Sequence, residues 1–143
     1  MKRVLVLNGP NLNMLGLREP DIYGHETLDD VKGLCLEAAE KLGLAIDFRQ
    51  SNHEGELVTW IQDARGVYDG LLINAAAYTH TSLALHDALK ILDIPIIEVH
   101  ISDPKKREEF RHFSYVEPLA VHVIAGQGPK GYVQGLEKLC ELL

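Results

Sequence analysis

The sequence predicts an α/β protein, a three-layer sandwich in which helices cover both faces of a five-stranded parallel sheet. Short apolar runs, which are typical of buried strands, alternate five times with segments that have the periodicity of helices. Parallel strands need long connections between them, so this repeated order is typical of layered α/β folds. The length of 143 residues suits one domain with a sizeable core, and we expect residues 1–143 to form a single domain.

The five expected strands are short apolar runs that are bounded by glycine, proline or polar residues. The first run ends at the turn sequence Asn8-Gly9-Pro10, and the second and third runs follow Gly43 and Gly70. In chain order, the expected strands cover residues 4–7, 44–48, 71–73, 95–101 and 119–125.

Helices are expected in the intervals between these strands and after the last of them. The first helix begins after Thr27, because Thr27 and Asp30 have the spacing of a capping box, and it ends at Gly43. Apolar stripes within residues 57–64, 82–92 and 132–143 indicate the later helices. Residues 82–92 are apolar nearly all round, so we expect this helix to be buried on more than one side.

Residues 9–26 interrupt the alternation of strands and helices, because they show neither a helical nor a strand periodicity and contain several glycines and prolines. A loop of this length inside a compact domain is usually a lid or a binding loop. Disorder is the alternative. The apolar side chains of Leu12, Met14, Leu15, Leu17 and Ile22 favour a packed segment instead, because such side chains gain free energy by burial.

Composition excludes several classes of partner. The net charge is −7, from 21 acidic and 14 basic residues, which disfavours DNA and RNA. No apolar stretch is long enough to span a membrane, and the run at residues 4–7 is too short for a signal-peptide core. Cys35 and Cys140 both lie on apolar helix faces, which favours buried free thiols over a disulfide. We therefore expect a cytoplasmic protein with no nucleic-acid or membrane partner.

Polar side chains gather where the first four expected strands end, which is where open parallel sheets bind their ligands. Each residue alone has an ordinary explanation as a turn residue, a helix cap or a surface charge. Their coincidence at four successive strand ends predicts a functional site. The set comprises Asn8, Asn11, Asn13, Arg18, Tyr23, Gln50, Ser51, Asn52, His53, Asn74, Tyr78, Thr79, His80, Thr81, Ser82, Glu98, His100, Ser102, Arg107 and Arg111.

The residue types in this set narrow the chemistry. Arg18, Arg107 and Arg111 suit a carboxylate or another small anion. No lysine lies within an expected strand, which disfavours a Schiff-base mechanism. His80 and His100 lack cysteines or carboxylates at metal-ligand spacing, so we expect no metal site.

The sequence offers one nucleotide-binding motif and one alternative function, and its residues disfavour both. Residues 126–131 match G-x-G-x-x-G, but no strand with an acidic residue follows them, so a glycine-rich turn before a helix explains them better than a dinucleotide site. A receiver or flavin-binding module on the same fold is the alternative function. Asn8, Asn11 and Asn74 stand where a receiver carries its acidic residues, and the first loop is not the Ser/Thr-rich phosphate loop of a flavodoxin.

Blocks that span nearly the whole chain resemble the family of type II 3-dehydroquinate dehydratases. They are Asn8-Gly9-Pro10-Asn11-Leu12-Asn13, Gly16, Arg18-Glu19-Pro20 and Ile22-Tyr23-Gly24, then Gln50-Ser51-Asn52-His53-Glu54-Gly55, residues 73–82, Glu98-Val99-His100-Ile101-Ser102 and residues 107–112. The resemblance implies a flavodoxin-like fold, no cofactor, and a dodecamer built of trimers. It also implies the dehydration of 3-dehydroquinate to 3-dehydroshikimate in the shikimate pathway of aromatic amino acid and chorismate biosynthesis, or the reversible reaction in quinate breakdown.

The resemblance further implies catalytic roles. Tyr23 is the base that removes a proton next to the ketone, and Arg18 supplies the positive charge that stabilises its phenolate. A free tyrosine has a pKa of about 10, and a decrease of 2–3 units takes roughly 3–4 kcal/mol. His100 is the acid that protonates the leaving hydroxyl, with Glu98 orienting it from two positions back on the same side of the strand. Asn11 matches the family's enolate stabiliser, acting through a bound water.

Substrate binding also follows from the resemblance. The matching positions are Asn74, His80, Ile101, Ser102 and Arg111, with the backbone amides of Ile101 and Ser102 on the carboxylate. Asp87 matches a residue that reaches the site of a neighbouring subunit, and Arg107 one that closes with the lid. The chain departs from the commoner family sequence at Met14, at His86 and over residues 103–106, which leaves the proposed catalytic positions unaltered.

Overall fold

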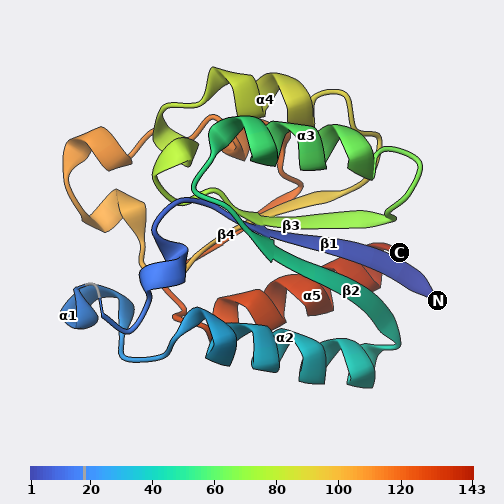
Figure 1. Ribbon diagram of the computed structural model, residues 1–143, viewed down its shortest axis with the longest axis horizontal. Helices are drawn as coiled ribbons and strands as arrows, with labels where there is room; N and C mark the ends of the chain where they lie inside the picture. Colours follow the sequence, from blue (N-terminus) through green and yellow to red (C-terminus); the bar gives the residue numbers. More distant parts are fainter. Residues whose placement is uncertain (18) are drawn as a thin grey trace.

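Five parallel strands form one sheet in the computed structural model, which describes residues 1–17 and 19–143 apart from the side chains of Pro20 and Tyr23 (Figure 1). The order across the sheet is β2-β1-β3-β4-β5, with every neighbouring pair parallel. This is the doubly wound, flavodoxin-like order, and it confirms the predicted fold class. The strands are β1 (Lys2–Asn8), β2 (Leu44–Gln50), β3 (Gly70–Asn74), β4 (Ile96–His100) and β5 (His122–Ala125).

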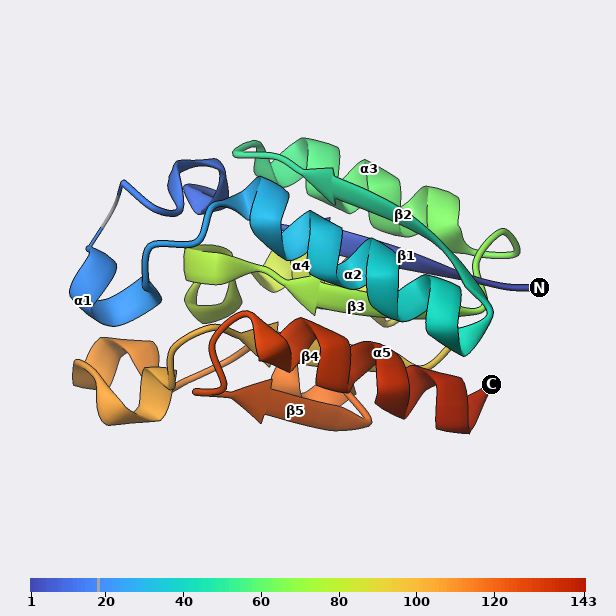
Figure 2. The same ribbon diagram turned by 90° about the horizontal axis from the view of Figure 1, so that it is seen from below.

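Different helices cover the two faces of the sheet (Figures 1 and 2). One layer holds α2 (Leu28–Leu42) and α5 (Lys130–Leu142), and the other holds α3 (Glu54–Ala64) and α4 (Leu83–Leu89). Successive residues of β1 serve the two cores in turn: Val4 and Val6 pack beneath α2 and α5, while Leu5 and Leu7 pack beneath α3 and α4. Burial on both faces explains why this strand appears in the sequence as a continuous apolar run.

The first long helix has the end signals that the sequence predicts. The Thr27 hydroxyl accepts a hydrogen bond from the Asp30 backbone N–H at 3.2 Å, and the Asp30 carboxylate accepts one from the Thr27 N–H at 2.9 Å. Gly43 closes α2 in the left-handed conformation, with φ 70°. The predicted capping box and helix end are therefore confirmed.

Three boundaries differ from the sequence prediction. β5 begins at His122 rather than at residue 119, because Glu117–Leu119 form a short 3₁₀ helix. α5 begins at Lys130, with Pro129 as its N-cap, two residues before the apolar stripe that predicts it. The helix expected over residues 82–92 covers only Leu83–Leu89, and in the single chain it is buried on one side, with Leu83 56% and Ile91 51% exposed. The expectation that this helix is buried on more than one side is thus wrong for the isolated chain.

The long loop after β1 is partly ordered by its own apolar residues. It contains a 3₁₀ helix, Leu12–Met14, and a single helical turn, α1 (Pro20–Tyr23). Leu12 and Leu15 are buried and join the core beneath α2, whereas Leu17 is 80% exposed. The packing expected from the apolar content is therefore confirmed at Leu12 and Leu15 and is wrong for Met14, Leu17 and Ile22, whose side chains are exposed.

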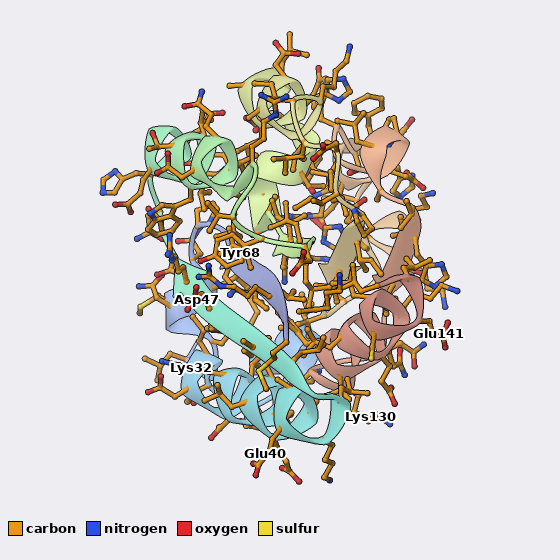
Figure 3. All side chains as sticks on the ribbon, turned by 90° about the vertical axis from the view of Figure 1, so that its right-hand side faces the viewer. Lys32, Glu40, Asp47, Tyr68, Lys130 and Glu141 are labelled. Carbon is orange, nitrogen blue, oxygen red and sulfur yellow. The ribbon has the colours of Figure 1, made fainter. Side chains whose placement is uncertain are left out.

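The edge of the sheet at β2 is held by polar contacts. The Tyr68 hydroxyl donates to the Asp47 carboxylate on β2, and the two side chains lie side by side in Figure 3. Burial, and then the bond to Asp47, raise the pKa of Tyr68. The Arg3 guanidinium stacks over the Tyr68 ring at 4.9 Å. Charged side chains on an edge strand discourage pairing with a foreign strand, so this cluster both fastens and protects the edge.

Candidate active site

A cleft lies at the carboxyl ends of β1, β3 and β4, the position that the fold predicts for a ligand. The space between its walls is about 510 Å³ with the open mouth included. Its walls come from three loops that are distant in the sequence. The lining residues are Pro10, Asn11, Leu12, Asn74, Ala76, Ala77, His80, His100, Ile101, Ser102, Pro104, Arg107 and Arg111.

Of the twelve residues that the resemblance assigns to the site, eight line this cleft and two, Glu98 and Asp87, do not. Glu98 lies behind His100 and lines an adjoining cavity. Asp87 is exposed on α4 and lines neither cavity. Arg18 and the side chain of Tyr23 lie outside the described residues.

The end of β1 is locked against the loop after β3. The Gly9 backbone N–H donates to the Asn74 carbonyl oxygen at 2.8 Å, and Asn8 and Asn74 are register partners across the sheet. A Cβ atom on Gly9 would lie 2.3 Å from the Ala75 carbonyl oxygen, closer than any side chain tolerates. The approach of these two loops therefore requires glycine at this position.

Asn11 is held by the end of the neighbouring strand β2. Its backbone is left-handed, with φ 68°, a conformation that asparagine tolerates better than most residues. Its N–H donates to the Asn52 side-chain oxygen at 3.0 Å. The Gln50 amide donates to that same oxygen and to the Gly9 carbonyl, each at 3.1 Å. These bonds fix Asn11 at the rim, where it lines the cleft.

His100 and Glu98 form a buried pair on β4, only 7% and 1% exposed. The pair bonds through His100 Nε2 and Glu98 Oε2, which leaves His100 Nδ1 as the ring nitrogen not bonded to Glu98. Ser114 Oγ and Thr79 Oγ1 donate to the same carboxylate oxygen at 2.8 and 3.3 Å. Burial opposes the ionisation of Glu98. The hydrogen bond and charge of His100, together with the two hydroxyls, outweigh it and hold the pKa of Glu98 below its usual value. An ionised Glu98 fixes the orientation of the imidazole ring of His100.

His80 lies in an environment that disfavours a positive charge on its ring. Its Nδ1 lies 2.8 Å from the Phe113 carbonyl oxygen, which can only accept, so Nδ1 carries the proton. Burial is the main cause that lowers the pKa of His80, and the charges of His100 and Arg111 add to it. A neutral His80 presents Nε2 as an acceptor, a group suited to a ligand hydroxyl.

Two arginines supply positive charge at the mouth of the cleft. Arg107 donates to Ser102 Oγ at 3.3 Å and approaches Glu19 of the loop after β1 at 3.9 Å. Arg111 donates from Nε to the Glu108 carboxylate at 3.1 Å. Their positions suit the binding of a small anion, as the sequence predicts.

The turn after β4 presents backbone amides as well. The carbonyl oxygens of Ile101 and Ser102 accept hydrogen bonds from Gly128 and Gly126, both at 3.1 Å. Since the peptide groups are trans, the Ser102 N–H points away from this glycine-rich segment. The segment is thus a turn that braces residues 101–102, in agreement with the interpretation of the motif as a glycine-rich turn.

Two side chains that bond to site residues were not singled out by sequence analysis. Ser114 bonds to Glu98, and Tyr132 bonds to Asn8 and Asn74. Ser114 lies in an irregular stretch with no sequence signal. Tyr132 belongs to an apolar helical stripe in the sequence. A buried tyrosine needs a partner for its hydroxyl, and that rule is a signal that could have singled it out.

Across residues 1–17 and 19–143, no group of three or more histidine, cysteine or acidic side chains is placed to hold a metal ion. No helix in the same part of the chain has the length and apolar character needed to cross a membrane.

Comparison with known proteins assigns the chain to a family. The model of the dehydroquinase class II family matches residues 2–140. The chain is 56% identical over 140 residues to 3-dehydroquinate dehydratase 2 of Pseudomonas putida, covering 98% of this chain and 94% of the relative. It is likewise 56% identical over 140 residues to the 3-dehydroquinate dehydratase of Streptomyces coelicolor, with 97% and 89% covered.

A solved structure agrees with the sequence relatives. The type II dehydroquinase from Propionibacterium acnes superposes with a TM-score of 0.95 at 45% identity, covering 99% of this chain and 97% of that one. The family match favours the enzyme over the signalling or flavin-binding modules that share this fold. On these matches in sequence and in structure, the chain belongs to the class II dehydroquinase family.

Proposed function

We propose that this chain is a type II 3-dehydroquinate dehydratase that acts in the shikimate pathway. The reaction is the anti elimination of water from 3-dehydroquinate through an enolate, and the product is 3-dehydroshikimate. The observation that carries the proposal is the cleft in which Asn11, Asn74, His80, His100 and Arg111 meet. Residues 1–143 act as a single catalytic domain.

The acid step is assigned to His100. Loss of the hydroxyl from the substrate needs a proton, and an imidazolium held by a buried carboxylate can supply it. Glu98 accepts from His100, Ser114 and Thr79 at once, so the ring is fixed before substrate arrives. Glu98 is a positioning residue for His100 in this scheme.

The base step is assigned to Tyr23 by resemblance. Its phenolate takes the proton from the carbon next to the ketone, the electron pair moves to the ketone oxygen as an enolate, and Arg18 stabilises the phenolate. Collapse of the enolate breaks the bond to the leaving hydroxyl, which takes its proton from His100 and departs as water. The loop that carries Tyr23 adjoins the cleft, because Ile22 lines one surface cavity together with Ser102 and Arg107.

Binding is assigned to the remaining groups of the cleft. The substrate carboxylate meets the backbone amides of Ile101 and Ser102, with Arg107 closing from the lid side. Asn74, His80 and Arg111 contact the ring hydroxyls. Asn11 stabilises the enolate through a water molecule. Since side chains provide the acid, the base and the enolate stabiliser, we propose that the reaction needs no metal or organic cofactor.

The proposal is tested by mixing the purified protein with 3-dehydroquinate after dialysis against a chelator. We expect the absorbance of a conjugated enone to rise without added metal or cofactor. Micromolar protein that produces no absorbance change would rule the proposal out. A protein that is active only after a divalent metal is restored would instead contradict the cofactor-free mechanism.

We propose in addition that the chain assembles into a dodecamer built of trimers and that Asp87 completes a neighbour's site. Leu83 and Asp87 lie four residues apart on the outer side of α4, and Ile91 lies in the turn that follows the helix; all three are exposed. Phe110 and Phe113, in the loop next to the cleft, are 70% and 59% exposed. An apolar surface with an acidic residue at its centre suits a second copy of this chain.

Leu83→Glu is expected to break this assembly, because it places a charge in an apolar contact. Light scattering should then give a smaller mass than that of the unaltered protein, which is expected to be twelve times the 15.9 kDa of one chain. Val67→Glu, a matched change at a side chain 47% exposed after α3, should leave the mass unchanged. A monomeric unaltered protein would contradict the proposed assembly.

We also propose that the protein acts in the cytoplasm. Cys35 and Cys140 carry free thiols, which suits a reducing compartment. Burial raises the pKa of the Cys35 thiol to about 12, so this thiol is inert and structural.

A further inference from the structure

Tyr132 lies in the first turn of α5, and it is completely buried. Helix α5 lies close against the sheet at this point. A Cβ atom on Gly135 would come within 2.5 Å of Leu72 Cδ1 on β3, so any larger residue would force the Leu72 side chain to move. The closeness lets the tyrosine ring reach the ends of β1 and β3, 124 positions away from Asn8 in the sequence.

The hydroxyl of Tyr132 bridges two asparagines that end these strands. It donates to Asn8 Oδ1 at 2.7 Å and accepts from Asn74 Nδ2 at 2.9 Å. Asn8 Nδ2 in turn donates to the Arg49 carbonyl oxygen at 3.0 Å, and Asn74 Oδ1 accepts from the Ala76 N–H at 3.1 Å. One connected chain of bonds therefore runs beneath the cleft from β2 to the loop after β3.

The direction of these bonds is determined by the backbone groups at the two ends of the chain of bonds. The Arg49 carbonyl can only accept and the Ala76 N–H can only donate, so Asn8 turns its oxygen toward Tyr132 and Asn74 turns its NH₂ group toward it. The phenol fits between them because it has one hydrogen to donate and an oxygen that accepts. That orientation leaves the Asn74 oxygen for Ala76, whose backbone is in the left-handed conformation at φ 52°. Ala76 begins the 3₁₀ helix Ala76–His80, which carries Thr79 and His80. The second N–H of Asn74 is then the group that a ligand in the cleft can meet.

We propose that Tyr132 is a positioning residue that sets the amide orientation of Asn74, and with it the affinity of the cleft for the substrate hydroxyl. This inference rests on the proposed function, since it names Asn74 as a substrate contact. Without the phenol, the Asn74 NH₂ group loses its buried acceptor, and the amide keeps only the bond from the Ala76 N–H. The amide is then free to turn away from the orientation that suits the substrate hydroxyl. The acid and the base are not touched by this change, so the effect falls on binding rather than on the chemical step.

Tyr132→Phe tests the proposal through a split between the two kinetic constants. We expect KM for 3-dehydroquinate to rise about 3- to 10-fold, the worth of one neutral hydrogen bond, with kcat changed less than about 2-fold. In the Asn74→Ala background, the same substitution should leave KM unchanged. Leu136→Val, one turn further along α5 and also fully buried, lowers the melting temperature without raising KM.

A readout that does not need activity makes the test independent of the proposed reaction. The side-chain NH₂ signals of Asn74 are identified in an NMR spectrum by their loss in Asn74→Ala. They should shift in Tyr132→Phe and stay in place in Leu136→Val. If Tyr132→Phe does not fold, Asn8→Ala keeps the tyrosine ring and frees its proton, and it should give the same rise in KM and the same shift.

The outcomes separate the two claims. An unaltered protein that does not turn over 3-dehydroquinate overturns the proposed function, while the NMR shift still reports whether Tyr132 orients Asn74. An active protein whose KM is unchanged by Tyr132→Phe overturns the positioning role. So does a KM effect that persists in the Asn74→Ala background, because it would then arise from general destabilisation.

Discussion

Tyr23→Phe is expected to lower kcat for 3-dehydroquinate by about 10²- to 10⁴-fold while substrate binding stays close to normal. Phenylalanine fills the same space and lacks the oxygen that accepts the substrate proton. The comparison requires kcat from steady-state kinetics and the dissociation constant from calorimetry with the same preparation. Because the change removes one atom, a loss of rate without a loss of binding assigns the chemical step to that oxygen.

Tyr115→Phe is the matched control for this experiment. The Tyr115 ring packs edge-on against Phe113 and His86, outside the set of groups that line the cleft. We expect its kcat to stay within about 2-fold of the unaltered protein, far below the change that loss of a general base causes. Near-normal turnover by Tyr23→Phe would remove Tyr23 from the role of base, and an equal loss in Tyr115→Phe would mean that the effect is not specific to the site.

Gly9→Ala is expected to destabilise the protein by about 3 kcal/mol or more, at the upper end of the cost of overpacking. The added methyl would lie 2.3 Å from the Ala75 carbonyl oxygen and 2.6 Å from its carbon. Both are backbone atoms, and the Gly9 N–H is bonded to the adjacent Asn74 carbonyl, so no side chain can swing aside. For a domain of this size, the melting temperature should fall by roughly 10 °C.

Gly55→Ala offers a control of opposite sign. Gly55 lies in the first turn of α3, and a Cβ there meets no atom within 4 Å. Alanine in a helix is favoured over glycine, so this variant should gain up to about 1 kcal/mol. The same calorimetric scan measures both variants. A Gly9→Ala protein as stable as the unaltered one would mean that the two loops can separate, contrary to the described contact.

Short-range features of this chain follow from its sequence because their causes are local. The capping box of Thr27 and Asp30 and the close of α2 at Gly43 depend on residues a few positions apart. The parallel sheet follows from the alternation of strand and helix, and the rule for ligand sites in such sheets then gathers Asn11, Asn74 and His100 at one edge. The position of the cleft was predictable for that reason.

Some errors came from the same reliance on local patterns. Residues 82–92 are apolar nearly all round, which predicts burial on more than one side, but a single chain covers only one side of α4. The run at residues 119–125 is apolar apart from His122, yet its first residue, Leu119, ends a 3₁₀ helix and the strand begins only at His122. A local pattern states what a segment can bury and not which other surface is available to cover it.

The sequence alone thus determined the fold class, the edge of the sheet that carries the cleft, and the residue types that meet there. The tertiary structure decided which side chains form hydrogen bonds with one another. Ser114 and Thr79 converge on Glu98 from separate loops, and Tyr132 reaches Asn8 and Asn74 from the last helix. The physical reason is how far apart in the sequence the interacting residues lie. Helix ends and strand periods are fixed by bonds between near neighbours, whereas a buried hydroxyl takes its partner from whatever the packing of distant elements brings within 3 Å.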